Sequence, residues 1–556
     1  MSKGKNKNKN KNAVKSGRVK AVTGTNEESA KESSETIAPA EEDKETLNPE
    51  SYVDPDLDLD DDGRVAPTIR SSAKKEKKAS SSPAKSEPSK KASSDKKEQV
   101  PFVQKLKSLF PLSFLIAFGF NLIYGSIFYS QYEAVSLYDT SSYFSAAEEI
   151  IAGRTDLLRT PVYPLFLHLC KKISPENVNR LAVTIQIVVF FISMWFFFRL
   201  VRQFTSNSVL CAAGTILYGC MTPITAFNFL MLTESFSISG LVIFAYLLVL
   251  FIKERKVWMY TVCIAMTLFL TLLRPSAVYL FVVVVCAAIP SVIDIIRKKI
   301  NWKEKRFLAP PIAFAICLAS LLGYMSMNRD YNNYFGLSYV SEMNKYYDVV
   351  QADIWHDNPD TEMVAAIQQK FDEGAGALTA AIDTELAFRN MDTEPDRLIE
   401  FNRNAIDQNT GKYVYYLAKK VLTMGYNHME YNLSNDSYFF KEEGNKEILW
   451  AGDLMDFNVN YVYFIFLLSA IGIVAVAVRK KHILWSEIMI ALIIGGQLAV
   501  NILAGPAEFH RLNAPCYPFS LLMVIVWAGI AYDAIMASAG KDMKEEESPE
   551  SPVTNG

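Results

Sequence analysis

A short polar loop at residues 138–167, YDTSSYFSAAEEIIAGRTDLLRTPVYPLFL, holds the residues of this chain best suited to chemistry. Asp139 opens the loop, Arg159 lies near its end, and Pro161 and Pro164 follow closely. A carboxylate can take the proton of an attacking hydroxyl, and an arginine can bind a phosphate through paired N–H groups. Long apolar runs flank the loop, and ionisable residues beside membrane segments are candidates for a functional site.

Spacing alone gives Asp139 a second interpretation, because Asp is also a preferred residue at the start of a helix. The apolar residues that follow repeat at helical spacing, which predicts an amphipathic helix ended by Gly153. We expect this helix, and the rest of the outer loop at 130–180, to lie along the membrane interface. The repeating apolar residues are Tyr143, Ala146, Ala147, Ile150 and Ile151.

Apolar runs long enough to cross a bilayer recur along the chain, and they predict an all-α, multi-pass bundle of about ten spans. Pro223 interrupts the third run and leaves a re-entrant segment open as an alternative there. The runs are 111–129, 181–198, 208–224, 234–252, 257–273, 277–296, 308–326, 457–478, 484–503 and 515–535.

Basic residues set the predicted orientation, because short cytoplasmic loops are rich in Lys and Arg. Clusters at 199–202, 253–256, 297–306 and 479–481 all follow even-numbered spans, so both termini are predicted to be cytoplasmic. The odd-numbered connections then face outward, and we expect their charged residues to converge on one outer face. Besides the loop residues, these are Glu234, Arg274, Glu508, His510 and Arg511.

The composition predicts two kinds of segment, since 50% of residues are hydrophobic while the first hundred are almost all polar. A lysine-rich tail without aromatic residues is typical of a disordered segment, and we predict no nucleic-acid partner for it. Seven cysteines without CxxC spacing and five scattered histidines indicate neither a disulfide framework nor a zinc site. The predicted parts are a disordered cytoplasmic tail (1–104), a transmembrane core (105–327), a mostly helical outer domain (328–456), C-terminal spans (457–536) and a cytoplasmic tail (537–556).

The loop resembles the first outer loop of GT-C superfamily glycosyltransferases, which include protein O-mannosyltransferases, the aminoarabinose transferase of lipid A and bacterial family 39 relatives. Four later strings are similar to pieces of that superfamily in the same order: LTESF at 232–236, LRPSA at 273–277, AIDQNTGKYVYYLAKK from 405, and EFHRLNAPCYPF at 508–519. The matching loop residues are Asp139, Tyr143, Ala146, Ala147, Gly153, Arg159, Pro161, Tyr163, Pro164, Leu165 and Phe166.

Two positions depart from the family's pattern. Many relatives have a second acid directly after the first, where this chain has Thr140, so a role that needs two adjacent carboxylates is not carried over. Relatives often pair the last arginine with Tyr, where this chain has Leu512.

The resemblance implies a transferase that moves a sugar from a polyprenyl-phosphate donor to a glycan, lipid or protein acceptor, with inversion, outside a bacterial plasma membrane. It makes Asp139 the catalytic base. It gives donor-phosphate binding to Arg274, Arg511, Arg159 and His510, and substrate binding to Glu234, Tyr143 and Tyr163. No cofactor is certain, although a divalent cation at Glu234 is a candidate.

Each role has a structural alternative, and the function has rivals. Arg274 is also placed to be an interfacial anchor, Glu234 to complement the dipole of its helix, and the two tyrosines to belong to an interfacial belt. A transporter or flippase for lipid-linked or small polar substrates would place ionisable residues near mid-membrane, where the spans have few. A third possibility is a non-catalytic membrane scaffold.

Overall fold

The computed structural model describes residues 109–131, 138–297, 304–390, 395–423, 459–481, 483–505 and 509–546. The chain divides into Met1–Asp95 and Lys96–Gly556, and every described residue belongs to the second unit. The predicted N-terminal tail, the part of the predicted outer domain after residue 423, Glu508 and the last ten residues lie outside the described part.

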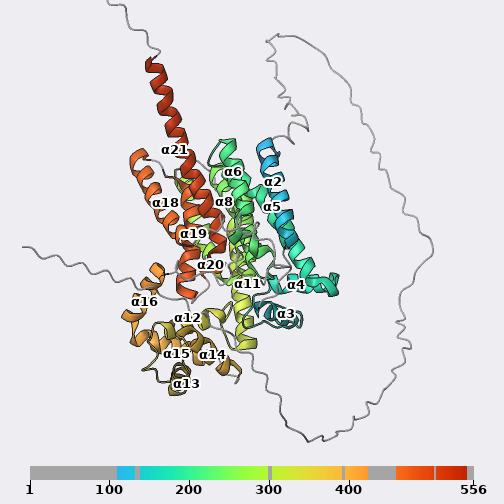
Figure 1. The fold of residues 1–556 in the computed structure, drawn as a ribbon, viewed down its shortest axis with the longest axis vertical. Helices are drawn as coiled ribbons and strands as arrows, with labels where there is room; N and C mark the ends of the chain where they lie inside the picture. The colour runs from blue at the N-terminus through green and yellow to red at the C-terminus, as the bar shows by residue number, and fades with distance from the viewer. Residues whose placement is uncertain are drawn as a thin grey trace, which may run out of the picture. The chain divides into compact units, whose positions relative to one another are not determined.

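The described residues form helices and no β-strand, as the predicted all-α class requires (Figure 1). Six helical segments are long and apolar enough to cross a membrane: Pro175–Val201, Glu234–Glu254, Pro275–Ile296, Ala309–Asn332, Trp485–Ala504 and Arg511–Met536. Four shorter apolar helices cover Leu112–Ile127, Ser208–Cys220, Val257–Leu273 and Val462–Val478. Each predicted run therefore contains an apolar helix. The described part of the chain holds six that meet both the length and the apolarity of a span, and the count of ten stays a prediction.

The third predicted run, 208–224, forms a helix that is too short to cross the hydrocarbon core. Helix α6 ends at Cys220 after 13 residues, which is about 20 Å of helix against a hydrocarbon core of about 30 Å. Its C-cap Met221 has an extended backbone, and two short helices, α7 (Thr222–Thr225) and η2 (Ala226–Asn228), follow before α8. The run 208–224 thus does not form one helix of spanning length, because the chain turns at the segment that contains Pro223.

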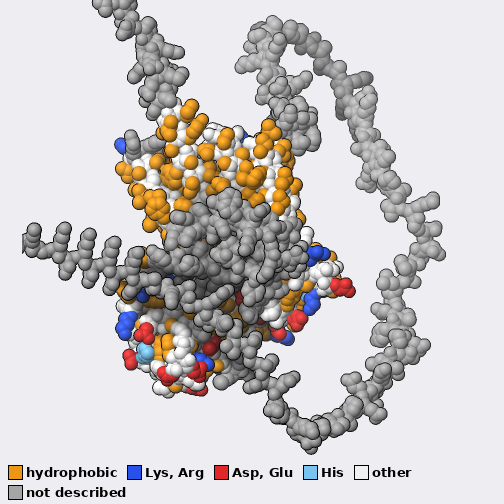
Figure 2. Space-filling view, viewed as in Figure 1, with side chains coloured by type: hydrophobic (Ala, Val, Ile, Leu, Met, Phe, Trp, Pro, Cys, Tyr) orange, Lys and Arg blue, Asp and Glu red, His pale blue; other side chains and the backbone are white. Residues whose placement is uncertain are grey.

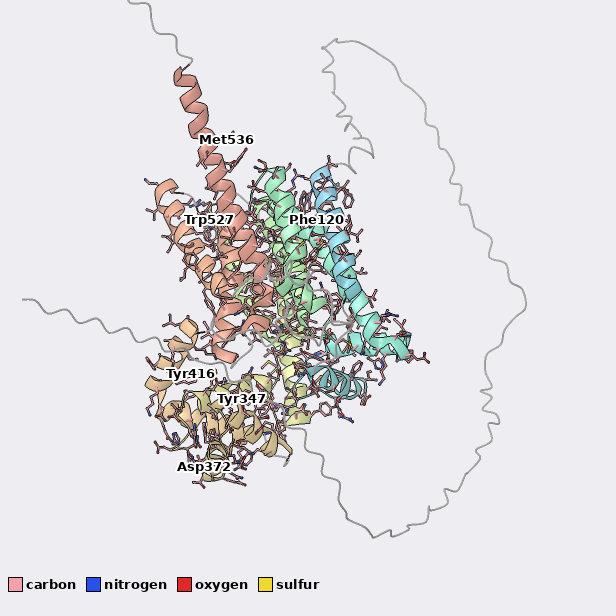
Figure 3. All side chains as sticks on the ribbon, in the orientation of Figure 1. Phe120, Tyr347, Asp372, Tyr416, Trp527 and Met536 are labelled. Atoms are coloured by element: carbon pink, nitrogen blue, oxygen red, sulfur yellow. The ribbon has the colours of Figure 1, made fainter. Side chains whose placement is uncertain are left out.

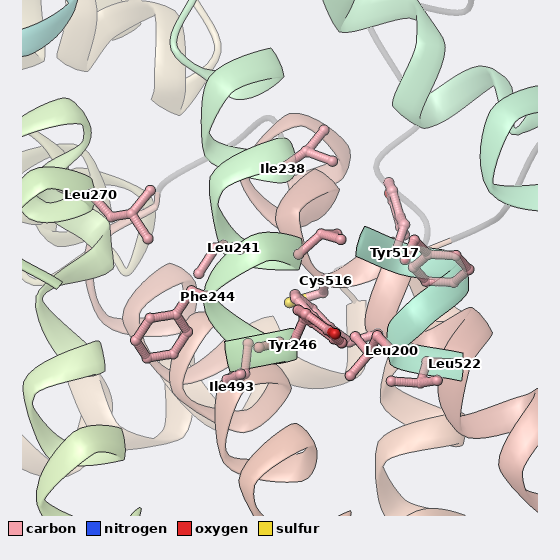
Figure 4. Packing of buried hydrophobic residues seen from close by; sticks show 14 of the residues in the cluster. Leu200, Ile238, Leu241, Phe244, Tyr246, Leu270, Ile493, Cys516, Tyr517 and Leu522 are labelled. Carbon is pink, nitrogen blue, oxygen red and sulfur yellow. The ribbon is translucent and has the colours of Figure 1, made fainter. Parts of the chain in front are cut away.

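Helix α8 (Glu234–Glu254) is the centre of the apolar core. It packs against α5 (Val178–Val201), α9 (Val257–Leu273) and α19 (Trp485–Ala504). In its most apolar window 78% of residues are buried, against 17% for α11 (Ala309–Asn332), so α8 is an inner helix and α11 a peripheral one. Figure 4 shows Leu241 and Phe244 of this helix among buried side chains of its neighbours, such as Leu270 and Ile493.

Apolar side chains are also exposed in large numbers on the outside of the span helices, especially on α2 (Leu112–Gln131), α10 (Leu280–Ile296) and α18 (Val459–Lys480). Figure 2 shows them gathered over the spans, with charged side chains over the end that carries α3 and α12–α16. An exposed apolar surface of this extent fits lipid rather than water. Helix α21 (Tyr517–Glu546) continues past residue 536, where the sequence analysis placed the start of a tail.

A second, smaller core lies between α11 and α18 in the chain and holds Trp355, Tyr346 and Phe401 at its centre. Its helices are α12 (Val340–Gln351), α13 (Thr361–Asp372), α14 (Ala377–Asn390), α15 (Pro395–Gln408) and α16 (Thr410–Thr423). We call this group the helical domain. Figure 3 places Tyr347, Asp372 and Tyr416 on it, and Phe120, Trp527 and Met536 on the spans. Leu157 and Leu158 of the opening loop pack against this core, so the domain contacts the loop directly.

Candidate functional site

Asp139 lies in the first turn of helix α3 (Tyr138–Ile151). The helix ends in a Schellman motif: Gly153 N–H donates to the Ile150 carbonyl at 3.1 Å and Arg154 N–H to the Glu149 carbonyl at 3.0 Å. Gly153 has φ +80°, a conformation that favours glycine, as expected for the predicted helix end. This closure sets the direction in which the chain leaves α3 and runs toward Arg159.

The segment between Gly153 and Arg159 is held by hydrogen bonds. One Asp156 carboxylate oxygen accepts the N–H of Leu158 at 2.9 Å and that of Arg159 at 2.6 Å. From the helical domain, Tyr339 N–H donates to the Leu157 carbonyl at 2.9 Å, and Ser338 Oγ donates to the Leu158 carbonyl at 2.6 Å. The backbone that carries Arg159 is therefore fixed both by its own loop and by the helical domain.

The Asp139 carboxylate accepts hydrogen bonds from two arginines. Arg159 Nη2 donates to Oδ1 at 2.7 Å, and Arg511 Nη2 donates to Oδ2 at 2.6 Å. Arg159 also donates through Nε to Ser142 Oγ at 2.8 Å, one helical turn further along α3. Residues 139 and 511, far apart in sequence, thus meet at one carboxylate.

Glu234 extends the same cluster into the protein. Arg511 Nε donates to Glu234 Oε1 at 2.7 Å, and Arg274 Nη1 lies 3.0 Å from the same oxygen. The Glu234 side chain is fully buried, Arg274 and Arg511 are 10% and 13% exposed, and Asp139 keeps 30%. We call Arg159, Asp139, Arg511, Glu234 and Arg274 the ion-pair cluster. Among the described residues, these three guanidiniums and two carboxylates carry one net positive charge in a largely buried place.

The charge of Asp139 depends on these arginines. Burial alone would raise the pKa of its carboxyl, but Arg511 and Arg159 outweigh burial and lower the pKa to about 2. Asp139 is therefore a carboxylate at any ordinary pH. Since a carboxylate with so low a pKa is a weak base, the cluster in this state holds Asp139 charged but not strongly basic.

The segment that begins at Arg274 contains three buried polar atoms that make no hydrogen bond within the described part of the chain. Among the described residues none is placed to form a hydrogen bond with Arg274 Nη1, Ser276 Oγ or Tyr279 OH, and all three atoms are buried. Arg274 Nη1 and Glu234 thus form an ion pair, but the N–H group does not point at the carboxylate oxygen as a hydrogen bond requires. Buried donors are nearly always satisfied in proteins, so this turn, η3 (Pro275–Tyr279), is able to donate to an acceptor group from outside the chain.

A buried amide in α5 holds the segment before Glu234. Gln186 Nε2 donates to the carbonyls of Asn228 and Leu230 at 3.0 and 2.9 Å, and its Oε1 accepts from Tyr163 OH at 2.8 Å. Ser235 Oγ donates to Asn228 Oδ1 at 2.6 Å. The irregular backbone after α6 is therefore satisfied inside the protein, and Glu234 enters α8 from a fixed position.

Amides in α19 hold the short helix α20 (Phe509–Asn513), which carries Arg511. Gln497 Nε2 donates to the Leu512 carbonyl at 3.0 Å, and Asn501 Nδ2 donates to Asn513 Oδ1 at 2.6 Å. These bonds fix the two residues that follow Arg511, so α19 holds the backbone next to its guanidinium.

A buried ion pair connects the helical domain to α19 and α20. Lys420 Nζ donates to both Asp348 oxygens at 2.9 and 2.7 Å and to the Ile502 carbonyl, near the end of α19, at 2.9 Å. It also lies 5.7 Å from the centre of the Phe509 ring in α20. Tyr416 OH donates to Asp348 at 3.0 Å, which completes a satisfied polar network.

Not all predicted site residues join the cluster. Glu148 is largely exposed, and Glu149 and Arg154 form an exposed pair with each other. Arg274 does not extend to the surface as an interfacial anchor would, because it is buried against Glu234. Glu234 is the first residue of α8, so it complements the helix dipole as well as pairing with the arginines.

The two tyrosines lie in the core. Tyr143 and Tyr163 are 5% and 0% exposed and pack edge to face with ring centres 4.9 Å apart. The Arg159 guanidinium lies over the Tyr143 ring, 4.6 Å from its centre. Their predicted contact with substrate stays a prediction, as does the role of His510, whose side chain lies outside the described part.

Sequence analysis missed the amides that support the cluster, Gln186, Gln497 and Asn501. A polar residue in an otherwise apolar span is a recognisable signal of a buried contact. Only ionisable residues were sought, so these amides were passed over.

The predicted divalent cation remains a prediction. Among the described residues no three His, Cys, Asp or Glu side chains are grouped as metal ligands would be. The two carboxylates of the ion-pair cluster accept hydrogen bonds from arginines.

No protein-family profile matches this sequence, and no curated protein matches it. Among solved structures, the chain is similar to the archaeal oligosaccharyltransferase AglB from Archaeoglobus fulgidus, in complex with an inhibitory peptide and a dolichol-phosphate, at 8% sequence identity and a TM-score of 0.37. The likeness covers 82% of this chain and 53% of that one, so the chain spans about half the length of AglB. At this level the likeness carries no argument about activity or substrate.

Proposed function

We propose that this chain is a membrane glycosyltransferase of the GT-C type. It moves a sugar from a polyprenyl-phosphate donor to an acceptor hydroxyl at the outer surface of a bacterial plasma membrane and inverts the anomeric carbon. The observation that supports this most is the ion-pair cluster, whose five residues carry one net positive charge at the end of an apolar helical bundle. An anionic amphiphile, with its tail in the bilayer and its phosphate at the cluster, matches both properties.

Asp139 and Glu234 differ in side-chain exposure, and we assign them different roles. Asp139 keeps 30% of its side chain exposed, so an acceptor hydroxyl can approach it, whereas Glu234 is fully buried. We assign Asp139 as the base and Glu234 as the group that holds Arg274 and Arg511 in place. The unsatisfied Arg274 Nη1 and Tyr279 OH provide donors for phosphate oxygens.

The reaction balances without a further reactant. The acceptor oxygen forms a bond to the anomeric carbon, the bond from that carbon to the phosphate oxygen breaks, and its electron pair leaves with the phosphate. The acceptor proton passes to Asp139. An anion that takes hydrogen bonds from Arg511 weakens the hold of that arginine on Asp139, so donor binding raises the pKa of the base toward a useful value.

The cluster lies at helix ends, which favours transfer over transport. Glu234 begins α8, Arg274 directly follows α9, and Arg511, in α20, is the first residue of the last spanning segment. A transport pathway would place such residues along the spans, near mid-membrane.

The test is donor turnover by the purified full-length protein with a panel of polyprenyl-phosphate sugars. Asp139→Asn keeps the shape of the side chain and removes the base, so turnover should fall about a hundred- to ten-thousand-fold. Glu148→Gln removes an exposed acid of the same helix, and it should leave turnover unchanged. The proposal fails if no donor is consumed, or if Asp139→Asn is as active as wild type.

Tyr279→Phe gives a second arm of the same assay. The hydroxyl has no partner among the described residues, so its loss should leave the thermal unfolding midpoint near that of wild type. If it donates to the donor phosphate, kcat/KM for the donor should fall about ten- to a hundred-fold. A lower midpoint with unchanged kcat/KM would contradict the phosphate contact.

A further inference from the structure

Helix α16 turns an apolar stripe away from the protein. Val414, Tyr415 and Leu422 are 58%, 71% and 76% exposed, and Ala418 between them is exposed as well. At about 100° per residue these four positions fall within one stripe about 100° wide. Lys420 lies on the opposite side of the helix, where it is buried. Single exposed apolar residues are ordinary, but a continuous stripe indicates a contact surface.

The contacts of Lys420 place α16 beside the end of a membrane span. Its ammonium donates to the carbonyl of Ile502 in the last turn of α19, and Asn344 Nδ2 of α12 donates to the carbonyl of Ala504 at 2.5 Å. Leu503, between these two carbonyls, is 55% exposed. Leu503 shows that α19 still presents an apolar side chain outward at the level where it contacts α16 and α12.

Charged residues border the stripe on one side. Helical spacing puts Lys412 and Lys419 beyond Tyr415, at the edge of the stripe rather than within it. Long lysine side chains and a tyrosine at such an edge are typical of a helix lying in a membrane surface, where the apolar face enters the bilayer and the ammonium groups meet the headgroups.

We propose that α16 binds the lipid surface: its Val414–Leu422 stripe enters the headgroup region of the bilayer, on the side of the ion-pair cluster. The helical domain is then attached to the membrane at α16 as well as through α11. Because Lys420 also contacts the Ile502 carbonyl and Phe509, lipid contact at α16 and the position of α20 are linked. The proposal does not depend on glycosyl transfer.

The test uses the full-length protein in vesicles of phosphatidylcholine and phosphatidylglycerol. Val414→Cys and Leu422→Cys are labelled with a polarity-sensitive fluorophore, and the wild-type protein, whose cysteines are buried or half-buried, sets the labelling background. Ala365→Cys on α13 is the matched control, because it is an exposed helical position in the same domain. We expect quenching at 414 and 422 by a lipid spin label near the glycerol, and quenching at 365 by aqueous iodide alone.

Two results would overturn the proposal. Iodide quenching at 414 and 422 equal to that at 365 would place the stripe in water. Protection of both positions from lipid spin label and from iodide would mean that protein covers the stripe. Both results come from fluorescence quenching of the labelled full-length protein, so neither requires that donor turnover be detected.

Discussion

Asp139 is held by one arginine on each of its oxygens. Arg511 and Arg159 come from opposite ends of the described sequence, and each donates to a different oxygen. This arrangement keeps the carboxylate charged and fixes its plane, at the cost of basicity. In such a site the pH dependence of activity is set by the arginines as much as by the acid.

The pH profile of donor kcat/KM gives a residue-scale prediction. The pKa of Asp139 is lowered to about 2, so the wild-type profile should show no acid limb from this group above about pH 4. Arg159→Gln removes one of the two cations, so the pKa of Asp139 should rise by about one to three units and bring the acid limb with it. The two ion pairs also stabilise the folded state. This stabilisation is complete above the ordinary pKa of Asp and is lost as the pH falls toward 2.

A matched variant separates this effect from general damage. Arg154→Gln removes an arginine of the same loop that pairs with Glu149 at the surface. Its profile should coincide with that of wild type. An acid limb near pH 6 in the wild-type protein would mean that Asp139 is not held as described.

At this scale the sequence predicted that charged residues of the outward-facing connections converge, and the structure brings Glu234, Arg274 and Arg511 together, while their roles stay predictions. Arg274 and Glu234 could be proposed because they lie in those connections and match the family's pattern. Their partners could not, because Arg511 reaches Asp139 across 372 positions of sequence. Gln497 and Asn501 were recognisable as polar residues in an apolar span, but the groups that they bind, Leu512 and Asn513, could not be predicted.

At the scale of elements, the site depends on two short interruptions between long helices. The segment after α6 and the short helix α20 both leave regular helix where a long span would continue. Each is satisfied by amides from a neighbouring span, Gln186 for the first and Gln497 for the second. Apolar length predicted an apolar helix in each run, while the count of ten spans stays a prediction. Pro223 left a break in the run 208–224 open, but the partners of the broken backbone could not be predicted, since they lie in α5.

The Asp348–Lys420 pair gives an element-scale prediction. Both side chains are almost fully buried, and Lys420 also donates to the end of α19. Lys420→Met leaves the Asp348 carboxylate buried without its cation, so the free energy of unfolding should fall by about 3–5 kcal/mol. The double variant Asp348→Leu with Lys420→Met removes both charges and should recover most of that loss. Thermal unfolding in detergent measures both changes.

Lys370→Gln provides the control, because Lys370 pairs with Glu373 on the exposed surface of the same domain. It should leave the midpoint unchanged, since exposed pairs add little. A single variant Lys420→Met as stable as wild type would show that the pair does not join the helical domain to α19.

At the scale of the whole molecule, burial separates inner from outer helices. The strongly buried α8 begins with Glu234, and peripheral helices such as α11 present leucine and isoleucine outward. The sequence could predict apolar helices in all ten runs, because hydropathy is a local property. It could not rank them from inner to outer, because most are apolar on every side.

The side of the membrane on which the cluster lies is the remaining prediction, and it follows from the basic loops. Glu148 lies on α3 beside the cluster with its side chain 72% exposed, and Lys256, at the other end of α8 from Glu234, is 54% exposed. A membrane-impermeant maleimide should label Glu148→Cys in intact cells and Lys256→Cys only after permeabilisation. The native cysteines are buried or half-buried and supply the background. The reverse pattern would put the cluster in the cytoplasm, and a polyprenyl-phosphate donor would then have to present its sugar there.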